Sequence, residues 1–352
     1  MSFGPSDIKK LREMTDAGMM DCKKALTESN GDMDKAVQWL RDKGLGAAAK
    51  KANKVAAEGL IGIKVEGKKA VIVEVNSQTD FVAQNEKFKN SVNEIVNHAF
   101  ANNLKDADAI NASTINGVAF SEYLSLQIAT IGENLVVRRS GLLEGDDTTA
   151  INGYVHANGQ VGVIITAKCD SAKTAEAMTS VIRDVAMHAA AMKPTTLSYK
   201  DFDAQYIADE TAGRIAKIEK ENEERVRLGK PLLNIPKYVS MAQLTDEVLA
   251  NAEKELKEKL KADGKPEKIW DKILPGQIAR FISDNTSLDQ EQCLLDQKFV
   301  MDDSKTVAQY IEEKAKACGG TATIVEFIRL EVGEGIEVEE EDFAAEVAKQ
   351  MA

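Results

Sequence analysis

Residues 59–75 read GLIGIKVEGKKAVIVEV, and residues 151–168 read INGYVHANGQVGVIITAK. Both stretches consist of two runs rich in Val and Ile around a turn signal, Glu66-Gly67 in the first and Asn158-Gly159 in the second. Each stretch therefore predicts a β-hairpin. A helical spacing of apolar residues follows each hairpin, and a further strand-like run comes later.

The two stretches also correspond position by position, as Gly62 and Gly153 illustrate. An internal duplication is the economical explanation. We therefore predict an α+β fold with a duplicated core, in which the hairpins pair into antiparallel sheets with helices over one face. Residues 55–145 would form the first half, and residues 146–197 together with 287–333 the second.

The two copies differ in the loop after their second strand. The first copy has NSQTDFVAQNEKF at residues 76–88, whereas the second has KCDSAKTAEAM at residues 168–178, which contains no aromatic ring. Loops run over the surface, so Phe81 either folds back into the core or is presented to a partner. Since the second copy has no apolar counterpart, the comparison favours presentation. A helix is expected to begin near Gln84.

The first 54 residues predict three short helices and a tether. Ser6 and Asp32 are expected as helix N-caps, Gly18 and Gly31 between helices, and Gly44 just after the last turn. A bundle of this size is marginally stable alone, so we expect it to lean on the rest of the chain or to serve it. The Ala- and Lys-rich sequence that follows reads as the tether.

An insertion in the second copy, residues 198–286, is called the arm from here on. Two charged helical stretches, 210–229 and 244–264, flank a segment whose prolines prevent one continuous helix. We predict that these two helices form a long antiparallel hairpin, a coiled coil with an apolar seam through Ile215, Ile218, Leu249, Ala252, Leu256 and Leu260. The hairpin either closes on itself or serves as a contact arm.

Residues 334–352 predict a C-terminal helical module. Phe343, Val347 and Met351 recur at a spacing of four, behind the glycine-containing sequence GEG. Such an apolar stripe packs either on its own protein or on a partner.

Composition and charge exclude several classes of protein. The formal net charge is −12, from 45 Lys and Arg against 57 Asp and Glu, and phosphate contacts need clustered basic residues, so nucleic acid is a poor partner. The four Cys and three His are too scattered to predict a metal or redox site, and no phosphate- or dinucleotide-binding motif is present. No long apolar run or secretory signal occurs, so we expect a soluble cytoplasmic protein that needs no cofactor and no membrane.

Several motifs together resemble the elongation factor Ts family. They are GMMDCKKALTESNGD at 18–32, VNSQTDFVA at 75–83, GKP at 229–231, FVMDDSKTV at 299–307 and FIRLEVGEGIE at 327–337, followed by DFAAEV at 342–347. The similarity runs from the first helix to the last, apart from the arm. It implies a ubiquitin-associated-like (UBA-like) domain over residues 1–54, the duplicated core, a coiled-coil hairpin and a C-terminal helix.

For function, the resemblance implies a guanine nucleotide exchange factor that releases GDP from elongation factor Tu and is not an enzyme. Thr79, Asp80, Phe81 and Val82 match the segment associated with displacing the magnesium ion of that partner. Further contacts are implied for Arg12, Met19 and Met20 in the N-terminal domain, and for Phe343 and Val347 in the C-terminal helix. The family's hairpin is a self-association element, so a homodimer or a 2:2 complex through the arm is also expected.

Two other classes of function remain open. A helical adaptor or chaperone would use the N-terminal bundle and the arm without using the loop that carries Phe81. An enzyme would have to recruit His98, His156 or His188. His98 and His188 occupy matched positions in the two copies, which indicates structural histidines instead.

Overall fold

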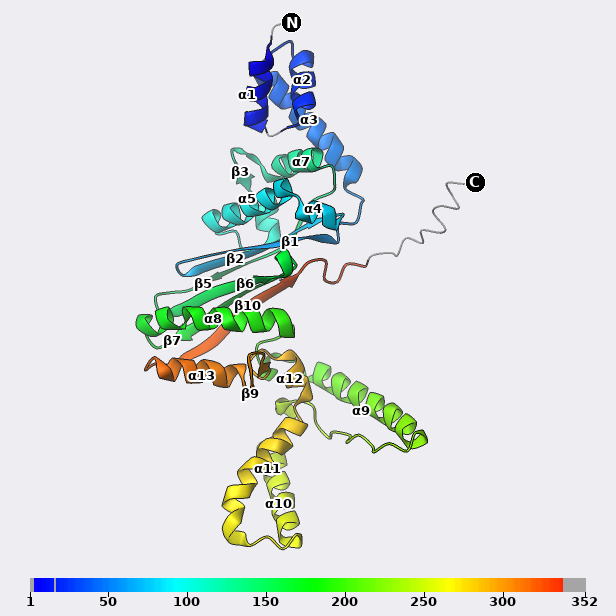
Figure 1. Ribbon diagram of the computed structural model, residues 1–352, viewed down its shortest axis with the longest axis vertical. Coiled ribbons are helices and arrows are strands. Elements are labelled where there is room, and N and C mark those ends of the chain that lie inside the picture. Colours follow the sequence, from blue (N-terminus) through cyan, green and yellow to red (C-terminus); the bar gives the residue numbers. More distant parts are fainter. Residues whose placement is uncertain (1–2, 16, 338–352) are drawn as a thin grey trace. The chain divides into compact units, whose positions relative to one another are not determined.

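The computed structural model describes residues 3–15 and 17–337, and Phe343, Val347 and Met351 lie outside these residues (Figure 1). The chain divides into two compact units, residues 1–190 with 326–352, and residues 191–325. Helices are combined with antiparallel sheets, which confirms the predicted α+β class.

Three helices, α1 (Pro5–Thr15), α2 (Met19–Glu28) and α3 (Met33–Lys51), open the first unit. Their shared core consists of Leu11, Ala17, Cys22, Ala25, Leu26, Ala36 and Leu40. Asp32 caps α3 as predicted, since its carboxylate accepts a hydrogen bond from the Lys35 amide at 3.1 Å. Ser6 is not a cap, because α1 already begins at Pro5, a residue suited to the first helical position.

The expectation that Gly44 follows the last turn of α3 was wrong. The helix continues through the alanine-rich residues 47–49 to Lys51, so the first half of the predicted tether is helical. Gly44 is instead a packing position against α7 (Phe120–Ile131). A Cβ atom there would lie 3.4 Å from both Leu126 Cδ2 and the Ser125 carbonyl oxygen.

The first sheet has the antiparallel order β1 (Glu58–Glu66), β2 (Lys69–Ser77), β5 (Val136–Glu144). Glu66 pairs with Lys69 across a two-residue turn, which confirms the first predicted hairpin.

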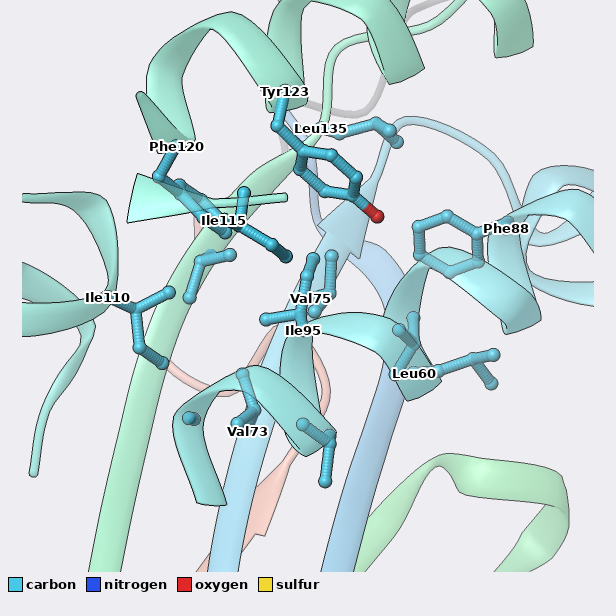
Figure 2. Close-up of a cluster of buried hydrophobic side chains, with 14 of the residues drawn as sticks. Leu60, Val73, Val75, Phe88, Ile95, Ile110, Ile115, Phe120, Tyr123 and Leu135 are labelled. Carbon is cyan, nitrogen blue, oxygen red and sulfur yellow. The ribbon is translucent and has the colours of Figure 1, made fainter. Parts of the chain in front are cut away.

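Helix α5 (Glu86–Asn102) and α7 cover one face of this sheet, with α6 (Ala107–Asn111), β3 (Thr114–Ile115) and β4 (Val118–Ala119) between them in the chain. Figure 2 shows the cluster that joins sheet and helices, including Leu60, Val73, Val75, Phe88, Ile95, Ile110, Ile115, Phe120, Tyr123 and Leu135.

The second sheet has the order β10 (Ala322–Glu331), β7 (Val161–Cys169), β6 (Thr149–His156), and α8 (Ala172–Met192) lies against it. The predicted two-residue turn is instead a four-residue connection, since His156 pairs with Val161. This longer connection packs on the first sheet. Gly159 approaches β1 so closely that a Cβ atom would lie 2.6 Å from Leu60 Cδ2.

The two sheets pack face to face through Ile61, Ala70, Ile72, Leu143, Ile151, Ile164 and Leu330. In each sheet the central strand is the second strand of the hairpin, and the strand after the helices pairs with it. The shared strand order agrees with the predicted internal duplication.

The second unit contains α9 (Ala204–Arg227), α10 (Asp246–Ala262), α11 (Trp270–Asp284), α12 (Ser287–Gln292), β8 (Lys298–Phe299), β9 (Asp302–Thr306) and α13 (Val307–Ala317). The predicted pairing of the two charged helices was wrong, because the helix that packs along α10 is α11. The chain that returns from α9 is hydrogen-bonded to α9 itself. Asn222 donates to the Leu233 carbonyl at 2.9 Å and accepts from the Leu233 amide at 2.7 Å.

Candidate functional site

The segment that carries Phe81 forms a short helix, α4 (Asp80–Gln84), which the sequence did not predict. Strand β2 ends at Ser77, and Thr79 remains extended with φ −125°. Thr79 then caps α4, because its side-chain oxygen accepts a hydrogen bond from the Val82 amide at 3.4 Å. The expected loop is therefore a capped turn of defined shape.

Helix α4 separates its apolar side chains into two groups. Val82 and Ala83 are buried in the cluster of the first sheet, with exposed fractions of 9% and 5%. Phe81, between Asp80 and Val82 in the chain, is 80% exposed. The ring does not close the core, so the structure confirms that Phe81 is exposed rather than packed.

Glu133 holds the start of this segment in place. Its carboxylate accepts hydrogen bonds from the Gln78 amide at 3.1 Å, the Thr79 amide at 3.0 Å and the Thr79 hydroxyl at 2.7 Å. Three bonds to one carboxylate are a strong local restraint. Sequence patterns do not point to Glu133, because nothing in its spacing connects it to a loop 54 residues away.

The turn at residues 132–134, which contains Glu133, is also hydrogen-bonded to the end of the N-terminal bundle. The Lys51 ammonium donates to the Gly132 carbonyl, and the Asn134 side chain donates to the Lys54 carbonyl at 2.9 Å. The turn at residues 132–134 thus contacts both the Phe81 segment and the chain that leaves α3.

Asp80 is exposed in the first turn of α4. It lines a hollow between α4 and the β6–β7 connection, together with Leu60, Ala83, Gln84, Lys89, Ala157, Asn158 and Gln160. Within residues 3–15 and 17–337, its carboxylate makes no ion pair with a basic side chain. Of the four predicted residues, Asp80 and Phe81 face outward, Thr79 is the anchor and Val82 is buried.

The predicted N-terminal contact residues lie on α1 and at the start of α2. Arg12 is exposed, and Met19 and Met20 are 59% and 74% exposed. Met14 is exposed beside them in the chain and was not predicted. The structure places these residues on a different element from α4, since the bundle packs on the core through α3 and α7.

A buried ion cluster lies farther back on the strand that leads to Thr79. Glu74 of β2 is fully buried and accepts hydrogen bonds from Arg139 Nε at 2.5 Å, Arg138 Nη1 at 3.3 Å and the Gly333 amide at 2.9 Å. Arg139 also pairs with Glu334 at 3.0 Å. This cluster fixes the last described residues of the chain to the first sheet.

The three histidines do not form a common site. His98 Nε2 bonds the Ser113 hydroxyl at 2.7 Å, and burial lowers the pKa of His98. His188 is buried on α8, and His156 Nδ1 contacts the Tyr154 hydroxyl at 3.1 Å. Among the described residues, no three or more His, Cys, Asp or Glu side chains gather in a way that could hold a metal ion. In the same residues, no helix has the length and apolar character needed to cross a membrane.

Comparison with known proteins matches the sequence of this chain to one family. The family model described as Elongation factor TS matches residues 78–232 and 233–334. The chain is 76% identical to Elongation factor Ts of Sulfurovum sp. (strain NBC37-1) over 351 residues, which cover 100% of this chain and 99% of that protein. It is 56% identical to Elongation factor Ts of Aliarcobacter butzleri (strain RM4018), with 99% of this chain and 98% of the relative covered. Elongation factor Ts of Campylobacter concisus (strain 13826) is 55% identical, with 98% of each chain covered. The chain belongs to the elongation factor Ts family.

Proposed function

We propose that this protein is a guanine nucleotide exchange factor for elongation factor Tu in translation elongation. The observation that carries the proposal is Phe81, which is 80% exposed on a capped turn held by Glu133. Family membership supports the same function. Exchange requires only differential binding of two partner states, so the protein acts by contact and not as an enzyme.

In the proposed mechanism, Phe81 inserts into the nucleotide-binding domain of elongation factor Tu near its magnesium ion. Magnesium demands near-ideal octahedral geometry, so a small shift of the loops that hold it weakens bound GDP. Asp80 accepts hydrogen bonds from the displaced groups of the partner. Thr79 and Glu133 keep the turn in shape, and Val82 anchors it from inside.

A single ring is insufficient for the whole effect. Burying one Phe contributes about 1.5–3 kcal/mol, or about one to two decades of affinity. Arg12, Met19 and Met20 therefore supply a second contact, Met being suited to irregular surfaces. Phe343 and Val347 supply a third. Because coupling is reciprocal, GDP must weaken this protein's binding by the same factor, and incoming nucleotide releases it.

The proposed domain organisation follows the same reasoning. Residues 1–54 act as a UBA-like domain, 55–145 as the first core half, 146–197 with 287–333 as the second, 198–286 as the arm and 334–352 as the C-terminal module. We place the coiled coil at α10 and α11, which pack together. Self-association through the arm would give a homodimer or a 2:2 complex. A monomeric mass in light scattering at tens of micromolar would exclude it. The site of action is the cytoplasm.

The test is release of fluorescently labelled GDP from elongation factor Tu with and without this protein. Phe81→Ala should lower stimulated release at least about tenfold, while the unfolding midpoint in urea stays unchanged. Leu228→Ala is the matched control, because Leu228 is 66% exposed at the end of α9 in the second unit. An adaptor without exchange activity would give no stimulation even with the unmodified protein. Equal stimulation by the unmodified and Phe81→Ala proteins would refute the role of the ring.

A further inference from the structure

Strand β5 contains a β-bulge close to the Phe81 turn. Glu74 of β2 is paired with Arg139, but the next residue of β2, Val75, is paired with Val137. Arg138 is therefore an extra residue in β5. A bulge bends its strand, increases the local twist and redirects side chains, and bulges are over-represented beside active sites.

The bulge changes which face of the sheet the side chains of β5 take. Leu142 packs against the cluster that joins the first sheet to its helices, and Val137 is buried in that same cluster. The two residues are an odd number of positions apart, and a regular strand would place them on opposite faces. The extra residue, Arg138, brings Val137 back to the helix side, and Leu135 follows it there (Figure 2).

The buried carboxylate of Glu74 stabilises this bulge. It accepts hydrogen bonds from Arg139 Nε at 2.5 Å and from Arg138 Nη1 at 3.3 Å. Neighbouring side chains of a regular strand point to opposite faces, so the bulge is what allows two consecutive arginines to reach one carboxylate. Both arginine side chains are partly buried, and without Glu74 their charges would lose the buried partner that they share.

The bulge lies next to the contact that orders the Phe81 turn. Two residue pairs, Val75 with Val137 and Asn76 with Val136, complete the pairing of β2 and β5 beyond it. The chain then reaches Glu133 on one side and Thr79 on the other, where the Glu133 carboxylate accepts hydrogen bonds from the Thr79 hydroxyl and amide. The direction in which β5 begins therefore decides whether Glu133 can reach Thr79.

We propose that Glu74 and Arg138 are positioning residues for nucleotide exchange. Their ion pair holds the bulge, and the bulge places Glu133 where it can order Thr79 and present Phe81. In this proposal neither Glu74 nor Arg138 contacts elongation factor Tu, and both act through Glu133. The inference rests on the proposed function of the Phe81 turn.

The test is a double-mutant cycle in the full chain, measured by stimulated release of labelled GDP from elongation factor Tu. The protein is kept in excess, so that release stays above the spontaneous rate in every variant. Glu74→Gln should slow stimulated release at least about fivefold by itself but less than about twofold in the Glu133→Ala background, because residues that act through one contact are not additive.

Hydrogen exchange separates this role from a purely structural one. In Glu74→Gln, the Thr79 amide should exchange faster by about the same factor as release slows, because that amide donates to Glu133. A purely structural role would instead lower the fraction of folded protein. Release would then fall by the same factor with and without Glu133→Ala.

A second variant guards against misfolding of Glu74→Gln. Arg138→Gln is milder, because Arg139 keeps its pair with Glu74, and it should give the same pattern with a smaller loss. Ser140→Ala is the matched control. Its hydroxyl donates to the Ile72 carbonyl at 3.0 Å between the same two strands, beyond the bulge from Glu133, so release should change less than about twofold.

The outcomes separate this inference from the proposed function. Equal losses of release with and without Glu133→Ala, or no loss in either background, would overturn the role of Glu74 and Arg138 while leaving the exchange function intact. Absence of stimulated release by the unmodified protein would refute the exchange function and this inference together.

Discussion

Replacing Glu133 by Ala tests whether the shape of the Phe81 turn matters as much as the ring. The change removes three hydrogen bonds, at 2.7, 3.0 and 3.1 Å, from Thr79 and Gln78. A hydrogen bond to a charged group contributes about 1.5–3 kcal/mol, and we assign that amount to the whole carboxylate because it is half-exposed. At about 1.4 kcal/mol per decade, the ordered turn becomes about 10- to 100-fold less populated.

Exchange should fall by a similar factor if only the ordered turn can engage elongation factor Tu. We would measure stopped-flow release of labelled GDP, together with hydrogen exchange at the Gln78 and Thr79 amides. Glu144→Ala, at the other end of β5, is the control, because Glu144 is exposed and lies far along the strand from this turn. Faster amide exchange with an unchanged rate of GDP release would refute the reasoning, since the turn would then be ordered by the partner itself.

Three further predictions concern stability. Gly62→Val should lower the free energy of unfolding by about 1–3 kcal/mol in urea titration, since even a Cβ atom would lie 2.6 Å from Val96 Cγ2; an unchanged midpoint would show that α5 can shift. Glu74→Ala should lower the free energy of unfolding by about 3–5 kcal/mol, because it leaves Arg139 without its buried partner; hydration of the partly exposed Arg139 reduces this loss. Arg139→Lys should lower the free energy of unfolding by a smaller amount. The contribution of Asp296 to the free energy of unfolding should fall as pH rises from about 4 past 6, by at most about 3 kcal/mol, because burial and the charge of Asp289 raise its pKa to about 6 and the folded chain binds the extra proton. Asp296→Asn should reduce the measured pH dependence without abolishing it, because burial also raises the pKa of Asp289.

Local patterns in the sequence were enough to predict much of the secondary structure of the core. Alternating Val and Ile predicted both hairpins, and apolar spacing predicted α5 and α8. Comparison of the two copies also favoured an exposed Phe81. These predictions succeeded because strand alternation and helical periodicity are properties of neighbouring residues.

Local sequence patterns predicted two other features wrongly, each for an identifiable reason. Gly44 reads as a helix stop, yet α3 continues through the alanine-rich residues after it, and Gly44 allows the close approach of α7. The charged helices of the arm share compatible seams, yet α10 packs with α11, a helix whose internal Pro275 conceals it in the sequence. Apolar seams show that a helix needs a neighbour, but they do not identify which one.

The sequence by itself determined the α+β class, the duplicated hairpins and the resemblance that the family comparison later confirmed, because these depend on local order along the chain. Only the tertiary structure decided that Glu133 anchors Thr79 and that Arg138 and Arg139 share the Glu74 carboxylate. Those relations join segments through space, and hydrogen bonding and desolvation depend on distance and burial rather than on separation in sequence.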